Sequence, residues 1–399
     1  MRIRQKTLGK VLIVLILVIL VLTFGVWISG ADTKNSQFTS PRERGQHAMV
    51  FDCANQKALL FGGSWDTGSG FQQIGDTWAY DYSNNIWAEL APSTHPSARD
   101  SHAMVYDSTN NQTILFGGGP TETWIYDYLS NTWIQKFTGI APPSLYWPAM
   151  VYDPVNQKVI LFGGFNEGIV DEFWAYDPAT NTWTELNPPL KPEARYGHIM
   201  VYDSANQKVI LFGGNSAEGY RDDTWAYDYT NNTWIELNPT THPSPRYWHS
   251  MIYDTLNQKG VLFGGSGESG NEFNLLGDTW AYDYSSNQWE DLSPSVNPPQ
   301  RANTALVYDS VNHKAILFGG LHEYQASYGD TWVYDYSNNS WVCVMSPSVS
   351  STSTSTNTIS PSTSTTDLVA TDFLRMRELI FTFGIIGIIM IYRRKKRKN

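Results

Sequence analysis

The chain has 399 residues and a net charge of −11, which is distributed unevenly. Residues 41–345 carry 14 basic and 34 acidic side chains, a net charge of −20, whereas the two flanks together carry +9. An acidic central segment argues against nucleic acid as a partner, because phosphates require a cationic surface. The 14% aromatic content, with 16 Trp, excludes a coiled-coil or disordered chain, and two cysteines are too few for a disulfide-built scaffold.

The N-terminal segment predicts export or membrane anchoring. Basic residues within 1–10 precede an uncharged apolar run over 11–28. This order is typical of a signal peptide or a membrane anchor, and small residues at 29–31 would permit cleavage after Ala31. Residues 1–31 are therefore expected to be a signal peptide or an N-terminal membrane anchor.

After this flank, one unit is repeated six times. The phrase VNQKVILFGG at 155–164 returns as ANQKVILFGG at 205–214, and the glycine pair recurs in every unit. The first Trp of each unit follows that of the previous unit at intervals of 46–55 residues. Such a fixed period is the signature of a repeat architecture rather than of several unrelated domains.

Each unit predicts four short strands separated by turns. An apolar run such as HAMVY at 102–106 is the first strand, and the ILFGG phrase, ended by its glycine pair, is the second. A segment such as TWAYDY forms the third, and a second Trp, nine residues after the first, opens the fourth. Both hairpins contain an Asn, which tolerates the left-handed backbone of a tight turn. The first-hairpin residues are Asn55, Asn110, Asn156, Asn206, Asn257 and Asn312.

The C-terminal flank predicts a stalk, a membrane span and a tail. Residues 346–372 are rich in Ser, Thr and Pro and are expected to remain extended. Residues 373–392 are long enough for a transmembrane helix with charged residues at its outer edge. The basic tail 393–399 should be cytoplasmic by the positive-inside rule, which places the repeats outside the cell at the cell membrane. The alternative, an amphipathic tail on a soluble protein, leaves the N-terminal run unexplained.

The repeat pattern resembles a known family. Four-stranded units stack radially around an axis because one such sheet cannot bury both faces alone. The glycine pair, the Tyr-Asp dipeptide and the spaced Trp residues resemble the kelch motif, and six copies over residues 41–345 resemble a six-bladed kelch β-propeller. The resemblance implies an all-β fold with four antiparallel strands per blade. The Trp pairs should fill the space between blades, and the sixth blade should pack on the first.

Alternating strand directions place the loops after strands two and four on one face, called here the loop face. Both Asn hairpins then lie on the opposite, hairpin face. Loops after strand two vary from 119–121 to 64–75 and 266–277, and variable loops on a rigid frame predict a binding surface. Aromatic residues there suit a glycan or a protein partner, with Trp65 and Trp147 as leading candidates. The predicted set is Trp65, Phe71, Tyr146, Trp147, Tyr196, Tyr220, Tyr247, Trp248, Phe273, Tyr324 and Tyr328.

Two recurring polar positions have both a functional and a structural interpretation. Arginines before strand one could hold an anion, or could form ion pairs between repeats with the acidic residue two places before the first Trp. The recurrence of both residue types at fixed places in the repeat favours the ion pairs. Histidines at the start of strand one could suggest a metal, but four blades should hold them too far apart. These residues are Arg44, Arg99, Arg195, Arg246 and Arg301, and His47, His102, His198 and His249.

The sequence contains no nucleophile or metal motif that predicts catalysis or a cofactor. Some kelch propellers are copper-radical sugar oxidases with a Tyr linked to a Cys, but Cys53 and Cys343 should lie away from the loop face and from each other. The sequence thus predicts a cell-surface kelch module that binds a glycan or protein. The alternative is a carbohydrate-active kelch enzyme such as a sugar epimerase or lyase. Glycosylation sequons at Asn111, Asn231 and Asn338 should all project from the hairpin face.

Overall fold

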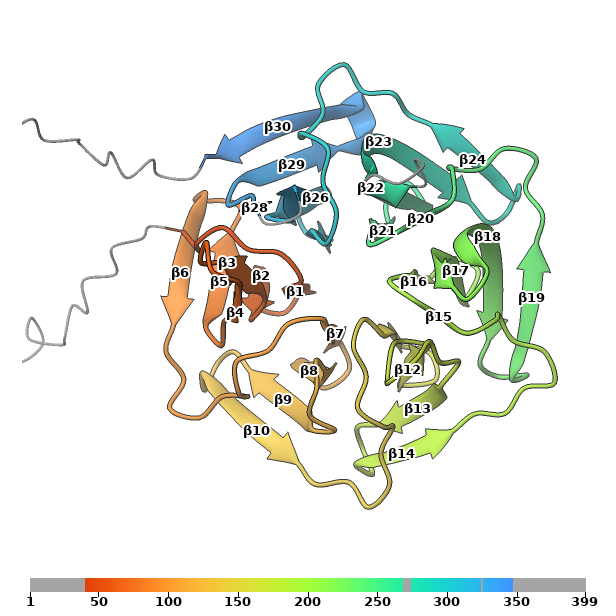
Figure 1. Ribbon diagram of the computed structural model, residues 1–399, viewed down its shortest axis with the longest axis horizontal. Coiled ribbons are helices and arrows are strands. Elements are labelled where there is room, and N and C mark those ends of the chain that lie inside the picture. Colours follow the sequence, from red (N-terminus) through yellow and green to blue (C-terminus); the bar gives the residue numbers. More distant parts are fainter. Residues whose placement is uncertain (1–39, 268–273, 324–325, 347–399) are drawn as a thin grey trace, which may run out of the picture. The chain divides into compact units, whose positions relative to one another are not determined.

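The computed structural model describes residues 40–267, 274–323 and 326–346. Six antiparallel blades surround a central axis, each built on four strands, with the first of the four innermost and the fourth at the rim (Figure 1). In two of the blades a fifth, short strand joins the sheet. The predicted all-β, six-bladed propeller with four antiparallel strands per blade is confirmed. No helix within the described ranges is long and apolar enough to cross a membrane. The predicted anchor at 1–31, the span at 373–392, the tail, and all of the predicted stalk except Ser346 lie outside those ranges.

The strand bounds follow the repeat closely. Blade 1 contains β1 (Ala48–Asp52), β2 (Lys57–Phe61), β5 (Thr77–Asp81) and β6 (Ile86–Leu90), and blade 2 contains β7 (His102–Asp107), β8 (Gln112–Gly117), β9 (Thr123–Asp127) and β10 (Thr132–Lys136). Blade 3 contains β11 (Ala149–Asp153), β12 (Lys158–Phe162), β13 (Phe173–Asp177) and β14 (Thr182–Glu185), and blade 4 contains β16 (Ile199–Asp203), β17 (Lys208–Ser216), β18 (Gly219–Asp228) and β19 (Thr233–Leu237). Blade 5 contains β21 (Ser250–Asp254), β22 (Lys259–Gly267), β23 (Asn274–Asp283) and β24 (Gln288–Asp291), and blade 6 contains β25 (Ala305–Asp309), β26 (Lys314–Phe318), β29 (Thr331–Asp335) and β30 (Ser340–Met345).

The glycine pair does not end the second strand in every blade, which corrects the prediction. In blades 4 and 5 the second strand continues past it, with a register shift between Phe212 and Gly214 in β17. Gly213 and Gly214 have φ values of 65° and 104°, a conformation that glycine adopts without steric cost. The continued strands pair with short segments before strand one, β15 (Arg195–Tyr196) and β20 (Arg246–Tyr247). Blades 1 and 6 instead carry separate small hairpins, β3–β4 (Ser64–Asp66, Phe71–Gln73) and β27–β28 (Leu321–Glu323, Ala326–Ser327).

The two hairpins of each blade use Asn differently. In the second hairpin Asn has the predicted left-handed backbone, as at Asn85 with φ 52°, and accepts a hydrogen bond from Tyr80 at 2.7 Å. In the first hairpin the prediction is wrong, because the next residue takes that conformation, as at Gln56 with φ 56°. Asn55 instead donates both its backbone and its side-chain N–H to the Asp52 carboxylate, which caps the turn.

Neighbouring blades are joined through the second Trp of each repeat. Trp133 of blade 2 donates its indole N–H to Thr77 of blade 1 at 3.1 Å and packs against Phe61 of the same blade. The same donation occurs from Trp87 to Thr331, from Trp183 to Thr123, from Trp289 to Thr224 and from Trp341 to Thr279. The contact between Trp87 and Thr331 joins blade 6 to blade 1, so the ring closes as predicted, without a blade shared between the ends of the propeller. Cys53 and Cys343 are exposed and are not joined to each other.

Candidate functional site

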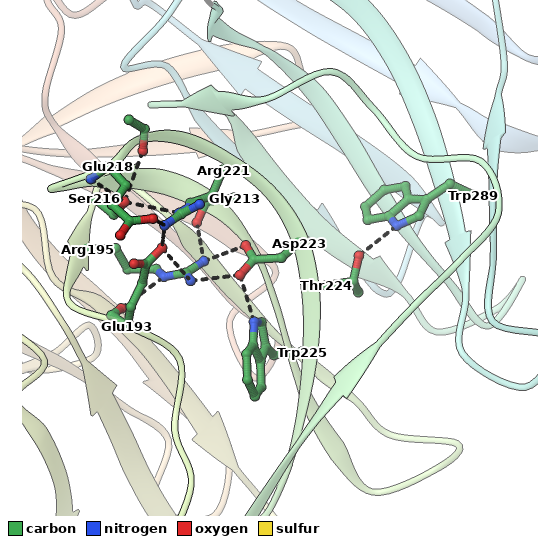
Figure 2. A network of polar contacts seen from close by, with 11 residues as sticks. Glu193, Arg195, Gly213, Ser216, Glu218, Arg221, Asp223, Thr224, Trp225 and Trp289 are labelled. Atoms are coloured by element: carbon green, nitrogen blue, oxygen red, sulfur yellow. Dashed lines mark hydrogen bonds and ion pairs between the residues drawn. The ribbon is translucent and has the colours of Figure 1, made fainter.

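The recurring arginines form the frame beneath the loop face. The Arg195 side chain is almost completely buried and forms two hydrogen bonds to the Asp223 carboxylate, at 2.6 and 2.8 Å (Figure 2). Asp223 also accepts the indole N–H of Trp225 at 2.8 Å. Burial alone would raise the pKa of Asp223, but the ion pair and hydrogen bonds outweigh it and lower that pKa. The five pairs are Arg44–Asp76, Arg99–Glu122, Arg195–Asp223, Arg246–Asp278 and Arg301–Asp330.

This geometry confirms the ion pair and corrects its placement. Both partners belong to one blade, whereas the prediction joined two repeats. The arginine reaches the neighbouring blade through its backbone, since the Arg195 carbonyl accepts a hydrogen bond from Gly164 of blade 3 at 2.8 Å. All five guanidinium groups are thus engaged in the frame and not held free for an anion.

The four recurring histidines line the channel but are poorly placed for chemistry. The His102 ring meets the ring of Phe61 in the preceding blade at 5.6 Å, edge to face. Burial, with a smaller contribution from the nearby Arg99 charge, lowers the pKa of His102 to about 3, and the pKa of His249 falls to about 3 for the same reasons. The ring nitrogens are shielded from solvent. Among the described residues, no three His, Cys, Asp or Glu side chains are arranged to hold a metal ion.

A ring of six backbone hydrogen bonds closes the mouth of the channel on the loop face. One residue per blade, two positions after the arginine position, has a left-handed backbone and donates its N–H to the carbonyl of the equivalent residue in the preceding blade. The bonds are 2.7–3.3 Å long, and the ring residues are Gln46, Ser101, Trp147, Gly197, Trp248 and Asn303. They line a cavity of about 110 Å³. Sequence reasoning missed this ring because the six residues share no side-chain type.

One half of the mouth is aromatic. Trp147 lies 5.6 Å from Tyr196 and 5.7 Å from Trp248 between ring centroids, and Tyr220 stacks on Tyr247 at 4.7 Å. We call the whole group the aromatic cluster, and it comes from blades 3, 4 and 5. Its members are Tyr146, Trp147, Phe165, Tyr196, Tyr220, Tyr247 and Trp248.

Six cluster members belong to the predicted set, and Phe165 was missed. The sequence did contain a signal for the grouping, because Tyr follows the arginine position in three consecutive repeats, at Tyr146, Tyr196 and Tyr247. Phe165 could have been found as the residue directly after a glycine pair, where the variable loop begins.

Other predicted site residues lie outside this cluster. Trp65 is on the small hairpin of blade 1, where the Arg42 guanidinium carbon lies 4.0 Å from its ring centroid. Tyr328 in blade 6 is covered in the same way by Arg301 at 3.9 Å. Phe71 is exposed on β4, while Phe273 and Tyr324 lie outside the described residues. The two leading candidates, Trp65 and Trp147, therefore belong to different sectors of the loop face.

Acidic residues predominate in the loop segments that carry the cluster in blades 3 and 4. The loop segments 163–172, 187–198 and 213–223 contain seven acidic and three basic residues. One basic residue is the buried Arg195, and the second, Arg221, forms ion pairs with Glu193 and Glu218 (Figure 2). The third, Lys191, pairs with Asp171 at 2.9 Å. The loop segments that carry the cluster in these two blades thus have a net charge of −4.

Comparisons with known proteins agree with the repeat pattern. Residues 28–192 and 189–363 each match the family model described as KLHDC2/KLHL20/DRC7 Kelch-repeats domain. One relative is the dynein alpha chain of the flagellar outer arm of Chlamydomonas reinhardtii, which is 33% identical over 106 residues. The aligned stretch covers 26% of this chain and 2% of the dynein chain. Another relative is Kelch domain-containing protein 1 of Mus musculus, which is 27% identical over 129 residues. That stretch covers 31% of this chain and 30% of the mouse protein. The chain spans less than a third of each of these relatives.

Proposed function

Because the chain belongs to the kelch-repeat family, we propose that its propeller is a non-catalytic binding module that takes a protein partner on the loop face. The observation that carries this proposal is the aromatic cluster. Three adjacent blades place six partly exposed rings and the buried Tyr247 on the face whose loops vary, above a frame that is the same in most blades. Large, rigid aromatic side chains of this kind are enriched where proteins bind one another.

A glycan is the second candidate. Partly exposed rings beside amide groups suit a sugar, whose C–H face stacks while its hydroxyls form hydrogen bonds. Tyr196 offers such a combination, because its hydroxyl accepts a hydrogen bond from Asn215 at 2.9 Å. A glycan array probed with the full chain tests this candidate directly.

The enzymatic alternative, a sugar epimerase or lyase, requires an acid and a base that a substrate can reach. The titratable side chains lining the mouth cavity are the four recurring histidines. Their lowered pKa values keep them uncharged at neutral pH, and their ring nitrogens are shielded. This arrangement favours binding over acid–base chemistry.

Site-specific photocrosslinking tests which face binds. A photoreactive phenylalanine analogue replaces Tyr220 on the loop face or Asn231 on the hairpin face of the same blade, in the full chain in its host. A specific protein adduct is expected from position 220, and it should disappear when Trp147→Ala is added. An adduct obtained only from position 231 would contradict the proposal.

The proposal also includes the location expected from the flanks, with the propeller outside the cell and anchored by the terminal segments. The three sequon asparagines are all exposed in hairpin turns of the same face, so glycans there would leave the aromatic cluster free. Glycopeptide mapping of Asn111, Asn231 and Asn338 is the test. If none carries a glycan in a host that glycosylates exported proteins, the location is wrong while the binding proposal is unaffected.

A further inference from the structure

The aromatic rings of the loop face differ in whether a cation of the same chain lies over them. In blades 1 and 6 the chain covers them with its own cations, Arg42 over Trp65 and Arg301 over Tyr328. In blades 3 to 5 no arginine or lysine of the described residues covers the rings of Trp147, Tyr196 or Tyr220. A guanidinium or ammonium group is attracted to the electron-rich face of such a ring, so the cluster offers positions that a partner's cations can fill.

The charges around the cluster favour the same occupant. Glu218 lies in the turn before β18 and Asp222 lies on β18, each two residues from Tyr220, and their side chains are 78% and 39% exposed. The three basic residues of this sector are already paired with carboxylates, as described above. An exposed acidic surface with its own cations engaged attracts a positively charged partner and repels an acidic one.

The channel mouth adds no opposing charge. The histidines beneath the cluster are uncharged at neutral pH because burial lowers their pKa values. The guanidinium of Arg246, the residue before Tyr247, is paired with Asp278 at 2.7 Å. A lysine or arginine approaching Trp147 and Trp248 therefore meets aromatic rings and backbone carbonyls rather than a fixed positive charge.

We propose that the aromatic cluster binds a basic peptide segment of a protein partner, whose Lys or Arg side chains lie over the open rings and face Glu218 and Asp222. This inference rests on the proposed function and specifies the chemistry of the partner. The cluster spans three blades, so it suits an extended segment with several cations rather than one small cationic molecule.

A library of random dodecapeptides displayed on phage, selected against the full chain in detergent micelles, provides the probe. The enriched peptides should contain more Lys and Arg than the starting library. Their affinity should fall about tenfold between about 50 and about 500 mM NaCl, because salt screens exposed charges. Replacing a contacting lysine by norleucine should weaken binding about fivefold, because the apolar stem remains while the cation is lost.

Matched variants locate the effect. The double variant Glu218→Gln/Asp222→Asn should weaken binding of the enriched peptides about fivefold. The control Glu185→Gln/Glu236→Gln removes the same charge from exposed positions on the outer strands of blades 3 and 4 and should leave affinity unchanged. Circular dichroism and thermal unfolding confirm that each variant is folded.

The outcomes separate the two proposals. Neutral or acidic peptides that lose binding in Trp147→Leu and Tyr220→Leu would leave the binding surface in place and overturn the basic partner. Basic peptides that bind equally well to Glu218→Gln/Asp222→Asn would also overturn it. Peptides insensitive to both aromatic variants, or a selection without enrichment, would overturn both proposals. If no peptide binds but a neutral glycan does, and Trp147→Leu abolishes that binding, the surface is a glycan site and the basic partner is overturned.

Discussion

Blade 3 departs from the other five blades at three positions of the frame. Leu145 replaces the buried arginine, Pro148 stands where other blades have His or Thr, and Phe173 replaces the threonine that opens the third strand. Two polar partners change accordingly. Glu172 accepts a hydrogen bond from Trp174 but has no arginine, and the indole N–H of Trp234 has no acceptor among the described residues.

The difference shows that apolar packing can replace the polar frame in one blade without loss of the fold. Leu145 is fully buried, and Phe173 contacts the ring of Trp234 at 5.5 Å. The same segment supplies Tyr146 and Trp147 to the aromatic cluster, so the departure from the repeat lies directly beneath the candidate binding surface. The departure from the repeated polar frame therefore coincides with the blade that contributes Tyr146, Trp147 and Phe165 to the aromatic cluster.

The largest effect should come from removing a carboxylate in a regular blade. Glu122 pairs with the fully buried Arg99 at 2.8 Å, whereas Glu172 has no such partner. Glu122→Gln should therefore reduce the free energy of unfolding by about 2–3 kcal/mol, because it leaves a buried guanidinium unpaired. Glu172→Gln should change it by less than about 0.5 kcal/mol, since glutamine can still accept from Trp174. Urea denaturation of both variants measures the difference, and equal losses would contradict this account of blade 3.

A second contrast separates blades with a channel histidine from blade 6, which has Thr304. The folded pKa of His102 is about 3, below its unfolded value near 6.5, so the unfolded chain binds a proton that the folded chain does not. The stability associated with the neutral ring is complete above pH 6.5 and falls as the pH drops toward 3. At pH 5 the loss should be about 2 kcal/mol for this histidine.

His102→Thr, which copies blade 6, should remove this part of the pH dependence. The free energy of unfolding of the variant should fall less than that of the wild type between pH 7 and pH 5, by about 2 kcal/mol. Carboxylates with lowered pKa values, such as Asp76 and Asp278, weaken both proteins in acid and cancel in the comparison. If the free energies of unfolding of wild type and variant fall by the same amount between pH 7 and pH 5, His102 is protonated in the folded state as well.

Much of the fold could be predicted because the same sequence pattern occurs six times. Each copy independently marks the strands, the glycine pair and the Trp that joins blades, so a weak copy is corrected by the others. Repetition also hides information. With identical units on both sides, the spacing between Arg195 and Asp223 could not show whether the partner lay in the same blade or in the next.

The candidate site could be predicted only as a face. The alternation of strands placed the aromatic loops together, but which rings meet depends on backbone conformations without a residue signature. The left-handed residues of the mouth ring include Gln46, Ser101 and Trp147, and those of the first hairpins include Gln56 and His313. The covering of Trp65 by Arg42 likewise depends on loop geometry, so Trp65 could not be separated from Trp147 by sequence.

The smallest expected effect tests whether blade 3 has lost a real interaction. Trp289 donates its indole N–H to Thr224 at 3.0 Å, whereas the equivalent Trp234 faces Phe173 in place of a threonine. Replacing either Trp by Phe removes a similar buried volume, but only Trp289→Phe removes a hydrogen bond and leaves a buried hydroxyl unpaired. Trp289→Phe should therefore destabilise the propeller by about 1 kcal/mol more than Trp234→Phe. A double-mutant cycle with Thr224→Val isolates this term, since the valine should cost less in the Trp289→Phe background than in the wild type. If the cycle gives no coupling, the Trp–Thr contact between blades contributes through packing alone, and blade 3 differs from the others less than its sequence indicates.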